Sequence, residues 1–355
     1  MRKHLLQAIG LLALWICADG FFAPIGGISS ARQIQTFSVT EIPFWHGFID
    51  SIASISSPAF LSPTQIIFGD LTDHRVVIVD SAEQTMRSIG RSGAGPGEFE
   101  EPASIAINPS GGFTVWDSSQ LRLSLFDESF QFVKMLRISM AVSWHRVSMR
   151  YLNDGTLIFV PGSLYHESEF SEQVVIIPPT FDTYSLFPSP CGIEIEDERI
   201  ASVSDFCERT VGIGSDQTIL IVNHHDYRIK RYSKSGDLLW DSGSLDPEFR
   251  LPSIRAMNER FGVTQYTHNI IFAVHEFIDI GFLIGATFQR GVYEFDCFID
   301  IRSSSGDLIQ RVPIPDGLWI SDFLANGESL YVLGYHPGRL NLPDIRIFAL
   351  ETRLR

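Results

Sequence analysis

Short runs of β-branched and aromatic residues alternate along the chain with turns rich in Gly, Asp, Asn, Ser or Pro. No long stretch keeps the spacing of apolar positions that an amphipathic helix would show. This pattern predicts an all-β protein. One strand in each repeating unit is apolar at nearly every position, and these strands occupy residues 65–70, 113–117, 156–160, 218–223, 281–286 and 329–334.

These six strands recur about every 50 residues, a period typical of propeller blades. A strand that is apolar on both faces suits a sheet packed between two neighbouring sheets. We therefore predict one domain over residues 33–355, a six-bladed β-propeller with four antiparallel strands in each blade. The chain ends after the third strand of the sixth unit, so residues 33–39 are expected to supply its outer strand and close the ring.

A second regularity marks the turn after these apolar strands. An aspartate or asparagine stands five residues before an arginine, and the two side chains bracket the turn between the second and third strands. The pairs are Asp70 with Arg75, Asp117 with Arg122, and Asn223 with Arg228. We expect each pair to tie its hairpin through a hydrogen bond to the arginine, and we interpret them as structural clasps rather than catalytic groups.

The best-formed unit contains a glycine-rich connection that ends in Gly-Glu-Phe at 97–99, then a proline, a strand ending in Asp117, and Arg122 opening the next strand. This succession resembles an NHL-type repeat. Residues 87–138 match that pattern best, and residues 212–243 match it moderately. We expect the glycine-rich loop to carry the chain from the outer edge of one blade to the inner strand of the next.

The resemblance implies an exported bacterial six-bladed propeller, a group in which most proteins lack a known activity. Two units depart from the pattern. Pro161 stands where the third unit should carry its aspartate, and the fifth unit has no aspartate–arginine clasp. The blade boundaries in those two units are therefore the least defined by the sequence.

The amino terminus has the features of an export signal. Arg2 and Lys3 precede an apolar run over residues 5–18, and small residues at 18–20 form a cleavage site. We predict a signal peptide over residues 1–20 and a periplasmic or extracellular protein with no membrane span after cleavage. A retained anchor is the alternative, although the run is shorter than a spanning helix requires.

The charge balance restricts the partners. The chain has 355 residues, 45% of them hydrophobic, and a formal net charge of −15. An acidic surface repels phosphate backbones, so nucleic acid is not an expected partner. We expect a monomer that binds a protein, a peptide or a glycan.

The cysteines leave two possibilities open. Cys191 and Cys207 flank a polar segment, and in an oxidising compartment they could form a disulfide; the alternative is two buried thiols. Cys297 lies inside an apolar strand and is interpreted as a packed side chain.

Histidines and acids give weak signals for a metal. The adjacent His224, His225 and Asp226 could hold a divalent ion, calcium or zinc, but ordinary rim histidines are the preferred interpretation. No cofactor is firmly implied. Resemblance to propeller lactonases would require carboxylates on the inner strands around a central calcium; Asp205, Glu276 and Asp322 meet this requirement only by position.

Two long connections between blades, 188–208 and 244–266, are expected to cover one face, and the second is compatible with a short helix. Five candidate ligand-binding residues form a cationic and aromatic patch there: Trp144, His145, Arg250, Arg255 and Arg260. The alternative is solvated loops whose arginines pair with nearby acids. No nucleophile, phosphate-binding or EF-hand motif is present.

We therefore predict non-enzymatic binding or scaffolding by the loop-rich face, because loops on a rigid framework commonly carry binding sites. The runner-up is a metal-dependent, lactonase-like hydrolase or lyase with its site at the central channel. A purely structural envelope component is the third possibility.

Overall fold

The computed structural model describes a larger unit, residues 37–351, and a smaller one made of residues 1–36 and 352–355. Of the smaller unit only residues 35–36 and 352–354 are described, and the predicted signal peptide lies outside them. The described ranges are 35–47, 51–138, 147–161, 172–190, 208–224, 227–244, 254–258, 263–266, 270–278, 280–289, 295–326, 329–336 and 344–354.

Six antiparallel sheets of four strands make up the larger unit, and each sheet is one blade. Blade 1 contains β2 (Ile55–Ser62), β3 (Gln65–Asp70), β4 (Arg75–Asp80) and β5 (Thr85–Ile89). Blade 2 contains β6 (Pro102–Ile107), β7 (Phe113–Asp117), β8 (Arg122–Phe126) and β9 (Phe132–Arg137). Blade 3 contains β10 (Ser148–Tyr151), β11 (Leu157–Val160), β12 (Gln173–Ile177) and β13 (Ser185–Pro188).

The second half of the chain forms the other three blades. Blade 4 contains β14 (Arg209–Ile213), β15 (Ile219–Asn223), β16 (Arg228–Tyr232) and β17 (Leu238–Ser244). Blade 5 contains β20 (Ile270–Phe277), β21 (Gly281–Gln289), β22 (Phe295–Arg302) and β23 (Leu308–Pro313). Blade 6 contains β24 (Trp319–Asn326), β25 (Ser329–His336), β26 (Asp344–Leu354) and β1 (Gln35–Ile42).

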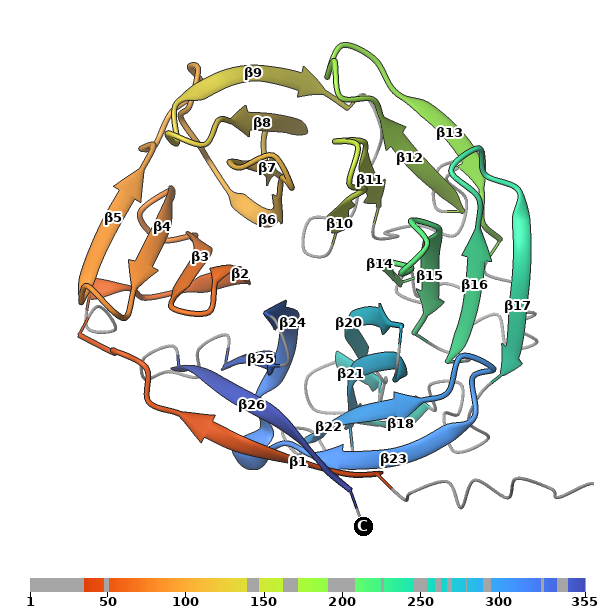
Figure 1. Cartoon of the computed structure of the whole chain (residues 1–355). Helices are drawn as coiled ribbons and strands as arrows, with labels where there is room; N and C mark the ends of the chain where they lie inside the picture. Colours follow the sequence, from red (N-terminus) through yellow and green to blue (C-terminus); the bar gives the residue numbers. More distant parts are fainter. Residues whose placement is uncertain are drawn as a thin grey trace, which may run out of the picture. The chain divides into compact units, whose positions relative to one another are not determined.

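The six inner strands β2, β6, β10, β14, β20 and β24 contact one another in this order, and β24 contacts β2 again (Figure 1). The blades therefore stand in a closed ring, and the predicted six-bladed propeller is confirmed. The strand expected at residues 33–39 runs over 35–42 and pairs with β26 as the outer strand of blade 6. This pairing joins the two ends of the chain in one sheet.

Apolar side chains fill every interface between neighbouring blades. Six separate buried clusters are present, one for each successive pair of blades, and one of them joins blade 6 to blade 1. At the interface of blades 2 and 3, the Trp116 and Phe159 rings meet edge to face, 5.0 Å apart. Burial on both sides explains why the second strand of each blade is apolar at nearly every position.

The glycine-rich connection between blades 1 and 2 follows the path expected from the sequence, from β5 to β6. Gly90 has a φ of +80°, and a Cβ there would lie 2.5 Å from the ring of the fully buried Phe99. Glycine at this position therefore allows both the left-handed turn and the close approach of the ring to the backbone.

The connection after blade 4 corrects one expectation. Instead of a short helix, β18 (Ile254–Asn258) and β19 (Val263–Tyr266) form a two-stranded antiparallel hairpin. Within the described ranges the only complete helical element is a 3-10 turn, η3 (Pro315–Gly317), and no helix there is long and apolar enough to span a bilayer.

Candidate functional site

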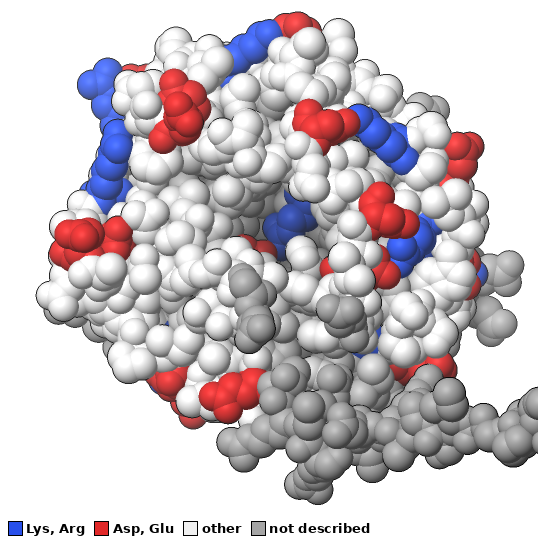
Figure 2. Space-filling model, viewed as in Figure 1, with Lys and Arg blue, Asp and Glu red and all other residues white. Residues whose placement is uncertain are grey.

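A cavity of about 240 Å³ lies at the centre of the ring and is lined by all six inner strands. Its lining consists of Ile55, Ser56, Ser57, Leu71, Ala103, Ser104, Val147, Ser148, Met149, Arg150, Arg209, Thr210, His224, Ile271, Trp319, Ser321 and Tyr335. Most of these residues stand at the beginning of an inner strand or just after a second strand. The cavity thus lies at the end of the channel where the sequence analysis placed the binding surface. Figure 2 views the ring from the other end of the channel, since β18 lies behind blade 5 in the same view (Figure 1); it shows the ring hollowed at its centre there too, with basic side-chain atoms at the base of the hollow.

Hydroxyl side chains beside this cavity link blades 1 to 5, one pair of neighbouring blades after another. The Ser56 hydroxyl donates to the Pro102 carbonyl at 2.6 Å, and the Ser104 hydroxyl donates to the Val147 carbonyl at 3.0 Å. At the next two interfaces Ser148 Oγ accepts the Val211 amide at 3.0 Å, and Thr210 donates to the Ile271 carbonyl at 2.6 Å. These bonds occupy backbone groups at the free edges of the inner strands, which would otherwise be open to another strand.

Ser57 brings strain to the same wall. It has a φ of +44° at a β-bulge in β2, and it precedes Pro58, a context that favours extended backbone. Its hydroxyl lies 3.4 Å from Ser104 Oγ. Unusual backbone conformations of this kind concentrate at functional sites.

An ion pair crosses the channel. Arg150 on β10 and Asp322 on β24 belong to blades 3 and 6, which face each other across the ring (Figure 1). Arg150 Nη2 lies 3.1 Å from Asp322 Oδ1, and Asp322 Oδ2 accepts the Phe60 amide at 3.1 Å. The carboxylate thereby holds the guanidinium in a defined position in the channel.

His224 contacts one of these hydroxyl side chains, that of Thr210. Its Nε2 lies 2.9 Å from Thr210 Oγ1, and its Nδ1 lies 3.3 Å from a Glu208 carboxylate oxygen. The Thr210 proton is donated to the Ile271 carbonyl, so Nε2 must donate to Thr210.

Two further features complete the lining. The half-buried Trp319 and Tyr335 rings meet edge to face, 6.0 Å apart, and supply an aromatic wall. Arg209 is buried and donates to the carbonyls of Ser189 and Gln173 at 2.8 and 3.2 Å. Burial lowers the pKa of this guanidinium to about 10, so it still carries its charge at neutral pH.

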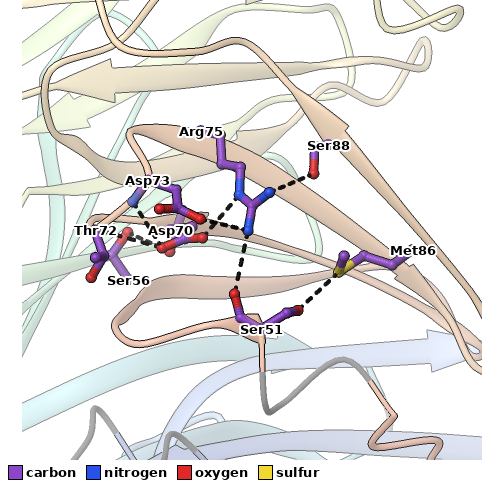
Figure 3. A network of polar contacts seen from close by, with 9 residues as sticks. Ser51, Ser56, Asp70, Thr72, Asp73, Arg75, Met86 and Ser88 are labelled. Carbon is purple, nitrogen blue, oxygen red and sulfur yellow. Dashed lines mark hydrogen bonds and ion pairs between the residues drawn. The ribbon is translucent and has the colours of Figure 1, made fainter.

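The first predicted clasp forms a direct contact. Arg75 Nε lies 3.0 Å from Asp70 Oδ2, and the same guanidinium reaches Asp73, the Ser88 hydroxyl and the Ser51 carbonyl (Figure 3). The Asp70 carboxylate is fully buried and also accepts the backbone amides of Thr72 and Asp73. This network ties the turn between β3 and β4 to the preceding loop.

The second pair is arranged differently. Asp117 and Arg122 are opposite each other in the sheet, but no direct bond joins them. Asp117 accepts the amides of Glu100, Glu101 and Gln120, and burial raises the pKa of its carboxyl. Arg122 donates instead to three carbonyls of the glycine-rich connection, those of Ala94, Gly95 and Glu98. The direct clasp predicted here is wrong, because both partners hold the loop between blades.

The third pair also differs from the prediction. Asn223 and Arg228 are opposite each other in the sheet, but the guanidinium of Arg228 forms a two-point ion pair with Asp241 on the outer strand, at 2.6 and 2.7 Å. An amide is a weaker partner for arginine than a carboxylate, so the acid on β17 takes its place.

The metal candidates are only partly described. His224 lines the cavity, whereas His225, Asp226 and Asp205 lie outside the described residues. Of the inner-strand acids, Asp322 pairs with Arg150, and Glu276 pairs with Arg231 and accepts the Ser215 amide. Within the described part of the chain, no three His, Cys, Asp or Glu side chains form a group that could hold a metal ion.

The other predicted residues are mostly undescribed. Trp144, His145, Arg250 and Arg260 lie outside the described ranges, as do Cys191 and Cys207. Arg255 is on β18, opposite Gln265. Cys297 is a buried free thiol, and burial raises its pKa to about 12.

Apart from His224, sequence reasoning missed the residues that line the cavity. A signal was present: five of the six inner strands carry Ser or Thr at one of their first three residues, as in "ISS", "PAS", "SMR", "RTV" and "WIS". Arg150 and Trp319 had no comparable signal, since the predicted ring of six places blades 3 and 6 opposite each other but does not show which of their side chains reach the channel.

Comparison with known proteins shows the fold alone. No family model matches the sequence, and no curated protein matches it significantly. A DUF4221 protein from Bacteroides vulgatus is 9% identical, with a TM-score of 0.55 over 91% of this chain and 100% of that one. A putative exported protein from Bacteroides fragilis is 13% identical, with a TM-score of 0.52 over 92% and 96% of the two chains. A luciferin-regenerating enzyme is 10% identical, with a TM-score of 0.51 over 89% and 95%.

Proposed function

We propose that this protein is a non-catalytic binding protein that holds the end of a glycan in the central cavity. The observation that carries the proposal is the lining itself, in which serine and threonine hydroxyls from five of the six blades share one cavity with the aromatic pair of Trp319 and Tyr335. Hydroxyl groups exchange hydrogen bonds with sugar hydroxyls, and aromatic rings pack against the apolar face of a sugar ring.

The size of the cavity favours a small group. A volume of about 240 Å³ lies just below the ~300–1,000 Å³ typical of small-molecule sites. It suits one sugar unit at the end of a chain better than a folded protein surface. The remainder of the glycan would lie over the loop-rich face, where the sequence analysis placed Trp144 and Arg255.

A peptide is a poorer fit. Extended peptides commonly bind by adding a strand to a free sheet edge. Here the hydroxyls of Ser56, Ser104 and Thr210 already bond carbonyls of neighbouring blades, at Pro102, Val147 and Ile271. Fewer backbone groups remain to pair with an incoming strand.

The same proposal includes export and a relationship to NHL-repeat propellers. The basic and apolar residues at 1–20 and the glycine-rich unit at 87–138 support these two points. A periplasmic or extracellular location would place the cavity where envelope and external glycans occur.

The test is isothermal titration calorimetry of the purified protein with monosaccharides and with oligosaccharides released from the native envelope. Ser148→Phe fills the cavity from β10 and should weaken binding at least tenfold. Ser129→Phe, an exposed position in the turn before β9, is the matched control and should leave binding unchanged. Thermal unfolding of both variants separates loss of the site from loss of the fold. Failure of every sugar to bind would overturn the proposal.

The runner-up, a metal-dependent hydrolase or lyase, would use His224 and the undescribed His225 and Asp226. Elemental analysis of the purified protein separates the two functions. A stoichiometric metal ion whose removal abolishes turnover of a lactone or glycan would favour the enzyme. Binding of a sugar without turnover, unchanged by a chelator, would favour the binding protein.

A further inference from the structure

The charges of the cavity differ from those of the whole chain. The sequence has 42 acidic and 27 basic residues, yet the lining contains two arginines and a histidine, and none of the described residues that line it is Asp or Glu. Two of these basic side chains have an acidic partner behind the lining, Asp322 for Arg150 and Glu208 for His224. The groups that face the cavity itself are basic, which favours a ligand with negative charge.

From this contrast we infer that the sugar held in the cavity is acidic, and that Arg150 binds its carboxylate. The inference rests on the proposed function and names the class of glycan, a uronic acid at the end of the chain.

Some N–H donors of the Arg150 guanidinium remain open to a ligand. A guanidinium carries five N–H donors, and within the described residues those of Arg150 reach only two partners, the Met149 carbonyl at 3.0 Å and Asp322 at 3.1 Å. The side chain is 25% exposed and lines the cavity, so the remaining donors are open to a ligand. Arginine and carboxylate form two parallel hydrogen bonds when the geometry allows.

Asp322 positions Arg150 without blocking the cavity. It contacts the guanidinium but is not among the lining residues. A ligand that enters the cavity therefore meets the arginine, while the acid holds it through one edge and accepts the Phe60 amide through its other oxygen. An arginine held in one orientation loses less entropy when it binds.

Ser148 adds a donor beside Arg150. The two residues are two positions apart on β10, so their side chains project from the same face of the strand. Ser148 Oγ accepts the Val211 amide, and among the described residues its own proton has no acceptor. The pair offers a hydroxyl and a guanidinium to the same ligand, and a carboxylate oxygen accepts from both.

The experiment compares sugars that differ only at the acidic group. Titration calorimetry is run with methyl glucuronide, methyl glucoside and methyl glucuronamide, and with the galacto series. Acetate and a tripeptide with a free carboxyl terminus test the other sources of a carboxylate. We expect a uronide to bind about 10- to 100-fold more tightly than its glucoside or amide, as for a hydrogen bond to a charged group.

A double variant tests the role of Arg150. Because loss of Arg150 alone would leave Asp322 without its cation, both residues are changed together, Arg150→Gln with Asp322→Asn. It should bind uronide and glucoside equally. Arg91→Gln, at an exposed arginine that is not among the lining residues, is the matched control and should keep the preference. If the double variant does not fold, binding to the unmodified protein is measured at increasing ionic strength instead. The preference for uronide over glucoside should then fall as ionic strength rises.

The outcomes separate the two proposals. If glucoside binds as tightly as uronide, the acidic-sugar inference is overturned and the glycan-binding function stands. If acetate or the tripeptide binds more tightly than any uronide, the inference is also overturned. If no sugar binds at all, the proposed function itself fails.

Discussion

Tyr227 and Asp300 join two blades through a buried hydrogen bond. The tyrosine, in the turn between β15 and β16, donates to Asp300 Oδ2 on β22 at 2.8 Å, and both side chains are fully buried. The Asp300 carboxylate also forms ion pairs with Arg302 at 3.1 Å and with Arg311 at 2.7 Å. Blade 5, whose sequence lacks an aspartate–arginine pair at the turn, is thus held by a buried network at its interface with blade 4.

We expect Asp300→Asn to be strongly destabilising, since it leaves the cation of the buried Arg302 without its acid. The loss should be about 3–5 kcal/mol in the free energy of unfolding, measured in urea. Tyr227→Phe removes one hydrogen bond to a charged group and should cost about 1.5–3 kcal/mol. Tyr184→Phe, at the interface of blades 2 and 3, is the control. Equal stability of the Asp300 and Tyr184 variants would contradict this account.

The two arginines that follow an aspartate should differ in importance. Arg122 is 1% exposed and holds three carbonyls of the glycine-rich connection, whereas the side chain of Arg75 is 22% exposed. Arg122→Ala should cost about 3–5 kcal/mol, and Arg75→Ala about 1–2 kcal/mol, because unpaired buried acceptors are costly. Hydrogen exchange should accelerate over residues 90–101 only in the first variant. Protection there in both variants would refute the assigned role.

His275 should make the stability depend on pH. Burial lowers the pKa of its imidazole from 6.5; Asp322 and Glu276 oppose the shift, Arg150 adds to it, and the ring packs 4.4 Å from that of Phe277. The unfolded chain therefore binds a proton more readily than the folded one. The contribution of the neutral His275 to the free energy of unfolding is therefore complete at pH values well above 6.5. It is lost as the pH falls below 6.5, by at most about 1.4 kcal/mol per pH unit.

The measurement is the unfolding free energy of the unmodified protein and of His275→Asn between pH 5 and 8. The difference between the two curves should be constant above about pH 7 and should shrink toward acid. Parallel curves over the whole range would exclude this histidine as the source.

Cys297 should be inert in the folded protein. Because burial raises its pKa to about 12, little thiolate forms at pH 8. Iodoacetamide should leave its peptide unmodified under native conditions and alkylate it in urea, as read by mass spectrometry. Rapid alkylation in the native state would show that the strand β22 opens.

The sequence analysis reached the fold because blade formation depends on local patterns. Runs such as 65–70 and 113–117 need apolar residues on both faces, and these runs coincide with β3 and β7. The closing strand was predictable from counting strands, since the last unit lacked its outer strand.

The clasps were less predictable. Asp70 and Arg75 are in contact, whereas Arg122 donates to carbonyls and Arg228 pairs with Asp241. Spacing along the sequence defines which two residues are opposite each other in a hairpin, but not which of several nearby acceptors a long side chain contacts.

The sequence by itself determined the six apolar sheets and their order, because these follow from neighbours along the chain, and counting the strands of the last unit identified the strand that closes them. Only the tertiary structure decided what faces the channel. Arg150 and Asp322 are 172 positions apart and meet because a ring of six places the third and sixth blades opposite each other. The hydroxyls of Ser56, Ser104, Ser148 and Thr210 become one site for the same reason: closure of the ring brings the starts of all inner strands to a common axis.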